Sequence, residues 1–335
     1  MRRIVLSLFL VLAAAFAAYS GYWLFLAHRL QTEIGPWADA QRARGTDLAW
    51  QGLAVEGYPL ALRLRFTAAT AAGQKPLPYA AAAPLLLAEA HVWDLRRWRV
   101  SAPDGAEATL PGEAGGVKGA SLDGMVTLDA DGGTGIDVTA RTVAGSGIVT
   151  GASLAQGELQ LTLPAHAPAN HREPAFAAAL RLSDLTLPVA VPSVGQEIET
   201  LRLALTLNGA VPAGKLRDAL AAWRQDGGTI ELTDGALRWG ALEASANGTL
   251  ALDDQLQPIG ALTATIENHN AMVDAVVASG QLRARDASLV KTILRLMAKP
   301  GADGRPQLTV PVTLQNDHVF LGPAQIAALP RFTWQ

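Results

Sequence analysis

The sequence of 335 residues contains no cysteine. Disulfide bonds are therefore excluded, and so is a lipoprotein anchor, which is attached through a cysteine. A chain of this size does not need disulfides, because about 300 residues can bury a sufficient apolar core. The net charge of −3 and the pI near 6.1 show no excess of positive charge, so no nucleic-acid partner is expected.

One long hydrophobic run lies at the N-terminus. Residues 4–27 form an uncharged stretch of about 24 residues, and roughly 20 apolar residues in a helix cross the hydrocarbon core of a bilayer. Arg2 and Arg3 precede the run, which favours a cytoplasmic N-terminus with the rest of the chain outside. Residues 1–27 are therefore expected to be a single-pass anchor in the inner (cytoplasmic) membrane, with the C-terminal domain in the periplasm.

A cleaved signal peptide is the alternative interpretation of the same run. Residues 15–17 read Ala-Phe-Ala, which fits a cleavage site after a basic start and an apolar stretch. The run nevertheless continues to Leu26, which favours a retained span. Tyr19, Tyr22 and Trp23 lie toward its outer end, where aromatic rings favour the headgroup layer. The following domain is exported in either case.

Residues 28–45 are expected to form a juxtamembrane helix. Leu30, Ile34 and Trp37 recur at the three- and four-residue spacing of one helix face. Pro36 lies inside this pattern. Because proline removes a backbone hydrogen bond and clashes with the preceding turn, we expect it to kink or divide the helix.

Beyond residue 45 the hydrophobic period changes from helical to two residues. Residues 60–67 alternate apolar side chains with arginine and threonine, so one face of the strand is apolar and the other polar. The same pattern returns in several later runs, including residues 201–207. The tentative apolar sheet face consists of Leu60, Leu62, Leu64, Phe66, Leu201, Leu203, Leu205 and Leu207.

Turn signals separate many of these runs. They are Asp131–Gly133, Asn208–Gly209, Asp234–Gly235 and Asn247–Gly248. Short strands joined by hairpin-type turns favour an antiparallel sheet over alternating βαβ units. Further helices are predicted only over residues 213–225, 270–279 and 286–298, with a last short turn at 323–328.

The predicted fold is mainly β (α+β), with an antiparallel β-rich domain in two halves and a few helices in the second half. The stretch 164–174 is rich in proline and histidine and is interpreted as a linker or exposed loop. The expected units after the helix are therefore a first half over residues 46–165, a linker over 166–174, and a second half over 175–335.

Residues that carry chemistry are few. His166 and His171 lie five apart in the expected loop, without the partners that would orient a metal site. Ser288 and Lys291 match an S-x-x-K pattern, but neither the S-D-N nor the K-T-G motif that accompanies it follows. We therefore predict no catalytic, cofactor-binding or metal-binding residue, no cofactor, and no enzymatic activity.

The apolar strand faces must be covered, because a fully buried leucine contributes about 1.5–3 kcal/mol relative to an exposed one. Two sheets packed face to face as a sandwich would provide the cover. A single sheet curled into an apolar groove would leave the cover to a ligand such as an acyl chain. The alternation of side chains does not distinguish these two arrangements.

The block from Trp37 through Gly45, Trp50 and residues 57–60 resembles the start of an uncharacterised domain-of-unknown-function family. Its members are Gram-negative bacterial proteins with one N-terminal membrane anchor and an exported β-rich domain. In the C-terminal part the same resemblance rests on residues 235–240, 246–252, 258–260 and 321–330. These C-terminal segments are also distantly similar to AsmA-like envelope proteins, which are associated with outer-membrane assembly and lipid movement.

The resemblance implies a place in the cell envelope, a β-rich fold and, more distantly, binding or movement of lipid in envelope maintenance. The expected partners are the cell membrane, through the N-terminal helix, and then phospholipid or another envelope protein. The alternative function is an anchored scaffold that binds another envelope protein and no small ligand. A hydrolase would need a convergent polar pocket, for which the sequence offers no signal.

Overall fold

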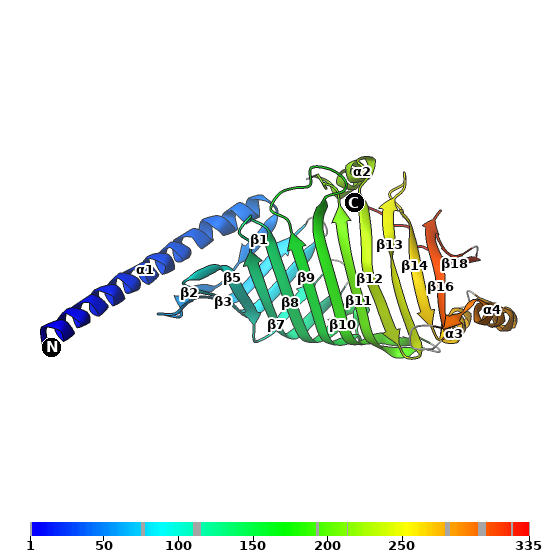
Figure 1. Cartoon of the computed structure of the whole chain (residues 1–335), viewed down its shortest axis with the longest axis horizontal. Helices are drawn as coiled ribbons and strands as arrows, with labels where there is room; N and C mark the ends of the chain where they lie inside the picture. Colours follow the sequence, from blue (N-terminus) through cyan, green and yellow to red (C-terminus); the bar gives the residue numbers. More distant parts are fainter. Residues whose placement is uncertain are drawn as a thin grey trace.

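The computed structural model describes residues 2–74, 78–109, 115–191, 194–212, 214–278, 282–300, 306–322 and 324–334. These residues form one long N-terminal helix and one antiparallel sheet of 18 strands (Figure 1). The predicted mainly β, antiparallel class is therefore confirmed. Because the described strands all belong to one sheet, the architecture is a single curved sheet and differs from a sandwich.

Helix α1 extends from Arg2 to Ala43 without interruption and contains Pro36. The expectation that Pro36 divides the helix is wrong. Ile34 and Trp37 next to Pro36 line a cavity against the sheet, and Ala38 is buried. These contacts on both sides of the proline hold the helix together, since tertiary packing can override a local preference.

Among the described helices, α1 is the one that is long and apolar enough to cross a membrane. Almost none of its most apolar part is buried within the protein. The first part of α1 projects beyond the sheet on the side where β2 and β3 lie (Figure 1). A signal sequence near the N-terminus meets the same criteria of length and hydropathy, so the finding is one N-terminal apolar helix compatible with single-pass anchoring.

The strands follow one another with few interruptions. Those of the first half are β1 (Thr46–Ala49), β2 (Gly52–Glu56), β3 (Ala61–Gly73), β4 (Tyr79–His91), β5 (Asp94–Ala102), β6 (Ala106–Thr109), β7 (Gly116–Leu128), β8 (Thr134–Ser146) and β9 (Ser153–Leu163). Those of the second half are β10 (Pro174–Val191), β11 (Gly195–Asn208), β12 (Thr229–Trp239), β13 (Leu242–Leu252), β14 (Pro258–Glu267), β15 (Lys299–Pro300), β16 (Pro306–Gln315), β17 (His318–Leu321) and β18 (Ala324–Ala328).

The sheet is a meander in which strands close in sequence pair side by side. In two places a pair of strands lies end to end in one position of the sheet. Strands β1 and β2 both pair with β3. Strands β5 and β6 both lie between β4 and β7. Strand β9 pairs with β10 across the expected linker, so the sheet continues without a break between the two expected halves. In Figure 1 the cyan strands pass behind the green ones, as expected for a strongly twisted and curled sheet.

The described residues of the second half form three shorter helices. They are α2 (Leu216–Gln225), α3 (His269–Ala278) and α4 (Ala284–Met297), which confirms the three predicted helices within a few residues. Ala213, Ser279 and Pro323, which were expected as ends of elements, lie outside the described residues. The last expected turn is instead strand β18, which pairs with β17. Free hydrogen-bonding groups at the edge of the sheet outweigh the local preference of this alanine-rich segment.

Two of the four predicted turns are wrong. Gly133 lies in the β7–β8 hairpin and Asn208 ends β11, as expected. Gly235 and Gly248 instead lie inside β12 and β13. A Cβ on Gly248 would lie 2.3 Å from the carbonyl oxygen of Ala261 on the next strand, and the φ of Gly248 is +153°. Glycine here allows two backbones to approach closely, which is a known use of glycine within strands.

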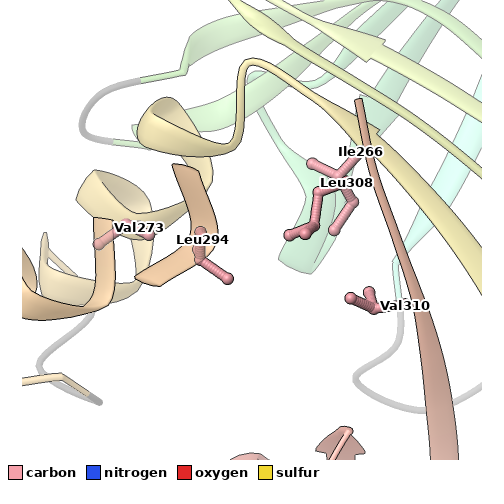
Figure 2. Packing of buried hydrophobic residues seen from close by; sticks show 5 residues of the cluster. All are labelled: Ile266, Val273, Leu294, Leu308 and Val310. Atoms are coloured by element: carbon pink, nitrogen blue, oxygen red, sulfur yellow. The ribbon is translucent and has the colours of Figure 1, made fainter. Parts of the chain in front are cut away.

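Helices cover the apolar face at the two ends of the sheet. At the C-terminal end Val273 and Leu294 from α3 and α4 lie opposite Ile266, Leu308 and Val310 from β14 and β16 (Figure 2). The Lys291 ammonium bonds the Asp274 carboxylate at 2.6 Å and links the two helices. At the N-terminal end α1 packs on the first strands through Trp23, Ala27, Leu62 and Val92.

We predict that Leu308→Ala lowers the free energy of unfolding by about 2–5 kcal/mol, the usual cost of truncating a buried leucine. Leu308 is fully buried in the C-terminal cluster, whereas Leu296 on α4 is 83% exposed. Leu296→Ala is therefore the matched control and should change stability by less than about 0.5 kcal/mol. Urea unfolding of the detergent-solubilised protein measures both, and equal effects would contradict the assigned core.

Candidate functional site

One face of the sheet is apolar along its whole length. Residues directly opposite one another in neighbouring strands point to the same face, so they can be followed as a row across the sheet. The central row crosses from β3 to β16, and each of its members is apolar or glycine. It consists of Leu64, Ala88, Val100, Gly124, Val138, Leu159, Leu180, Leu203, Gly235, Ala246, Ala264 and Val310.

The rows on either side have the same character. One consists of Ala102, Leu122, Ala140, Gly157, Leu182, Leu201, Leu237, Ala244, Ile266 and Leu308. The other consists of Trp98, Val126, Ile136, Leu161, Ala178, Leu205, Leu232, Gly248, Leu262, Val312 and Leu321. We call the surface formed by these three rows the apolar face.

The opposite face of the sheet is polar. A representative row consists of Ser101, Asp123, Thr139, Glu158, Arg181, Arg202, Ala236, Ser245, Thr265 and Thr309. Ion pairs connect neighbouring strands on this side, such as Arg141 with Asp123 at 3.2 Å. The sheet therefore has one face suited to water and one suited to an apolar environment.

A bulge in β12 preserves this division. Ala204 of β11 pairs with Asp234, but the next residue, Leu205, pairs with Leu232, so Thr233 is an extra residue in β12. The extra residue lets Leu232 and Gly235 point to the same face although they are three positions apart. Asp234–Gly235 thus belongs to this bulge.

The structure brings the two predicted leucine groups onto one face. Leu64 and Leu203 belong to the same central row, and Leu201 and Leu205 to the flanking rows. Leu62 and Leu64 are buried, Phe66 is half-buried, and the four leucines of β11 are half-buried. Leu207 follows the alternation on β11, opposite Phe176 and Ile230. Leu60 is the exception, because it precedes β3 in a turn and is 60% exposed.

The middle of the apolar face has little cover from the described part of the chain. None of the hydrophobic side chains described on β7, β8, β9 and β10 is buried. Leu159, in the centre of the central row, is 41% exposed. Buried hydrophobic side chains of the face are found instead on the strands that contact α1 or the α3–α4 pair. The apolar face is therefore closed at its ends and open in between.

Helix α1 docks onto the first strands through Trp23. Its indole Nε1 donates a hydrogen bond to the Ala61 carbonyl oxygen at 2.8 Å, and its ring meets that of Tyr58 edge-on at 5.4 Å. Trp23 is buried against Leu62 and Val92. The sequence pattern predicts Trp23 at the membrane surface and does not indicate its packing on the domain.

Farther along, α1 and the sheet line an apolar cavity of about 580 Å³ that is open to the outside. Leu30, Ile34 and Trp37 of α1 form one wall, and β1 and β3–β7 form the rest. Among the described residues that line it, Thr70 is the single one with a hydroxyl, amide or charged side chain. The volume lies within the range of small-molecule sites, which are mostly apolar and concave. The cavity is the part of the apolar face that lies beneath α1.

Ion pairs fix the C-terminal end of α1 beside this cavity. The guanidinium of Arg42 bonds Asp47 at 2.8 Å and Asp39 at 2.7 Å. The hydrogen bond and charge of Asp47, with a smaller contribution from Asp39, raise the pKa of Arg42 above its ordinary value. All three side chains are exposed, so the pairs orient the helix end and contribute little stability.

A second hollow, of about 470 Å³, lies on the polar face over β11–β14 and β16. Arg238 of this hollow pairs with Glu243 at 3.1 Å, and Arg202 pairs with Asp234 at 3.6 Å. The Gln307 amide donates to the Glu267 carboxylate at 2.7 Å. These groups satisfy one another across the strands, which makes the hollow a surface depression with internal polar contacts. Within the described residues, no group of three or more His, Asp or Glu side chains is placed to hold a metal ion.

We predict that Trp23→Ala destabilises the docked helix by about 3–5 kcal/mol, as is usual for truncating a buried tryptophan. Trp23→Phe keeps a ring in place but leaves the Ala61 carbonyl without its donor, and should cost about 1–3 kcal/mol. Hydrogen exchange of the β3 amides in the detergent-solubilised protein measures both. Tyr22→Ala, at the exposed neighbouring residue, is the control and should leave exchange unchanged. Exchange as fast in Tyr22→Ala as in Trp23→Ala would contradict the docking of α1 through Trp23.

Comparison with known proteins identifies the family and goes no further. Neither the curated proteins nor the solved structures gave a match. A family profile described as "Uncharacterized protein conserved in bacteria (DUF2125)" matches residues 23–330. The match begins at Trp23 and covers the rest of α1 and all the described strands of the sheet. The chain therefore belongs to this bacterial family, as the resemblance of its sequence motifs predicted.

Proposed function

We propose that this protein is a non-enzymatic, membrane-anchored lipid-binding protein of the bacterial envelope, with its sheet in the periplasm. Acyl chains would lie along the apolar face, which binds or passes lipid in envelope maintenance. The observation that carries the proposal is the continuity of the three apolar rows from the first strands to β16, with an open middle.

The extent of the open face argues for a permanent apolar occupant. Monomeric soluble proteins rarely expose contiguous apolar patches larger than a few hundred Å². Each Å² of apolar surface removed from water contributes about 25 cal/mol. The middle strands β7–β10 present such side chains without burying them. An acyl chain is apolar along its length, needs no polar partner, and so fits a face that offers none.

The position of α1 favours membrane lipid as the source of that acyl chain. The same helix provides the apolar N-terminal segment and one wall of the 580 Å³ cavity. The central apolar row crosses 12 strand positions from β3 to β16, and 11 spacings of about 4.8 Å give an apolar path of about 53 Å. Lipid leaving a bilayer beside α1 would thus meet a continuous apolar surface from the cavity onward.

The charged residues before the apolar segment support the periplasmic position of the sheet in this proposal. Arg2 and Arg3 precede the apolar segment, and positive residues favour the cytoplasmic side. The similarity to AsmA-like envelope proteins stays a prediction from short sequence motifs. The alternative, a scaffold that binds another envelope protein, would cover the same face with a protein surface and is one outcome of the following test.

We predict that phospholipid co-purifies with the full-length protein and that Leu159→Asp abolishes it. Leu159 is half-exposed on the apolar face, so the charge should repel acyl chains without unfolding the sheet. Gln160→Asp introduces the same charge at the next residue, which points to the polar face, and should retain lipid. Native mass spectrometry after release from mild detergent counts the bound lipid, and circular dichroism checks the fold.

Two results would overturn the proposal. One is a wild-type protein without bound lipid that instead retains a stoichiometric envelope protein, which would establish the scaffold. The other is equal lipid content in the Leu159→Asp and Gln160→Asp variants, which would place the lipid away from the apolar face.

A further inference from the structure

Three large hydrophobic side chains are exposed together at the start of the sheet. Tyr58 and Leu60 lie in the turn between β2 and β3 and are 45% and 60% exposed. Trp93 lies in the turn between β4 and β5 and is 66% exposed. The backbone of Val92 donates to the Leu60 carbonyl oxygen, so the two turns are joined. We call residues 57–60 and 92–93 the tip.

The tip contacts the most apolar part of α1. The Tyr58 ring meets the Phe16 ring edge-on at 6.5 Å, and the Tyr58 hydroxyl lies 2.7 Å from Ser20 Oγ. The Tyr19 hydroxyl donates a hydrogen bond to the Pro59 carbonyl oxygen. The segment from Phe16 to Trp23 is therefore in contact with the domain along its length.

The position of these contacts along α1 sets their depth in a bilayer. A helix rises 1.5 Å per residue, so Phe16 lies about 20 Å and Trp23 about 30 Å along the axis from Arg3. The hydrocarbon core of a bilayer is about 30 Å thick. With Arg3 at the cytoplasmic surface, the contacts between tip and helix fall in the outer third of that core. A tilted helix would bring the tip deeper.

The chemistry of the tip suits the boundary between acyl chains and headgroups. Tyrosine and tryptophan favour this boundary because their rings are apolar and their edges polar. The Trp93 ring stacks on His91 at 4.9 Å, which holds it outward from the sheet. Arg96 and Arg97 follow on β5 and are exposed, with Arg97 3.9 Å from the Asp94 carboxylate. Basic side chains next to inserted aromatic ones are suited to phosphate headgroups.

We propose that the tip inserts into the outer leaflet of the membrane that α1 crosses, so that the sheet is held by two attachments. Leu60, Trp93 and Tyr58 enter the acyl region beside α1, and the first strands of the apolar face begin at the level of the headgroups. This proposal rests on the anchoring part of the proposed function and is independent of lipid binding in the groove.

The absence of cysteine makes a depth measurement direct. Single cysteines are introduced as Leu60→Cys and Trp93→Cys, labelled with an environment-sensitive fluorophore, and the full chain is reconstituted into phosphatidylcholine–phosphatidylglycerol vesicles. Leu10→Cys within α1 is the positive control. Val189→Cys is the matched negative control, because Val189 is an exposed hydrophobic residue (74%) near the end of β10, far along the sheet. Spin-labelled lipids carrying the quencher near the headgroup report the depth.

Insertion predicts a shift to shorter emission wavelength and strong quenching at positions 10, 60 and 93, with neither effect at position 189. Quenching at position 10 together with solvent-exposed fluorescence at 60 and 93 would overturn tip insertion and leave the anchor intact. Solvent-exposed fluorescence at position 10 would overturn the anchor and the tip together. The lipid content in native mass spectrometry remains a separate result, so failure of the groove and failure of the tip are distinguished.

Discussion

The two-residue period of the strands, kept in register from one strand to the next, is the constraint on which the rest of the structure depends. A shift of one residue in any pairing would turn the apolar side chains of that strand to the polar face. The rows from β3 to β16 show that no such shift occurs. Where β12 carries an extra residue, the bulge absorbs it and Gly235 returns to the apolar face.

This register produces a surface that the chain covers only at its ends. At one end α1 packs on Leu62 and Val92, and at the other Val273 and Leu294 pack on β14 and β16. The buried side chains that hold the tertiary structure are thus separated from the open middle strands. A ligand on the middle of the face could enter or leave without disrupting either cluster. In the proposed function, stability and lipid binding therefore belong to different parts of the same sheet.

Much of this organisation could be predicted from the sequence, because alternation and apolar length are local properties. The faces of β3 and β11 and the N-terminal helix followed from them. The role of Gly248 could not be predicted, since it depends on the approach of Ala261 from the next strand. Docking of Trp23 likewise depends on the Ala61 carbonyl, 38 residues away. Strand β18 forms because an edge is available, which its own alanine-rich sequence does not indicate.

The meander also shapes how the chain can fold. Strands from β7 to β14 each pair with the next strand in sequence. Pairings that are short in sequence give a low contact order, which favours fast folding. Synthesis starts at the N-terminus, so α1 and the first hairpins exist before the later strands. The sheet can therefore lengthen one strand at a time, and its growing edge is covered by the next segment to arrive.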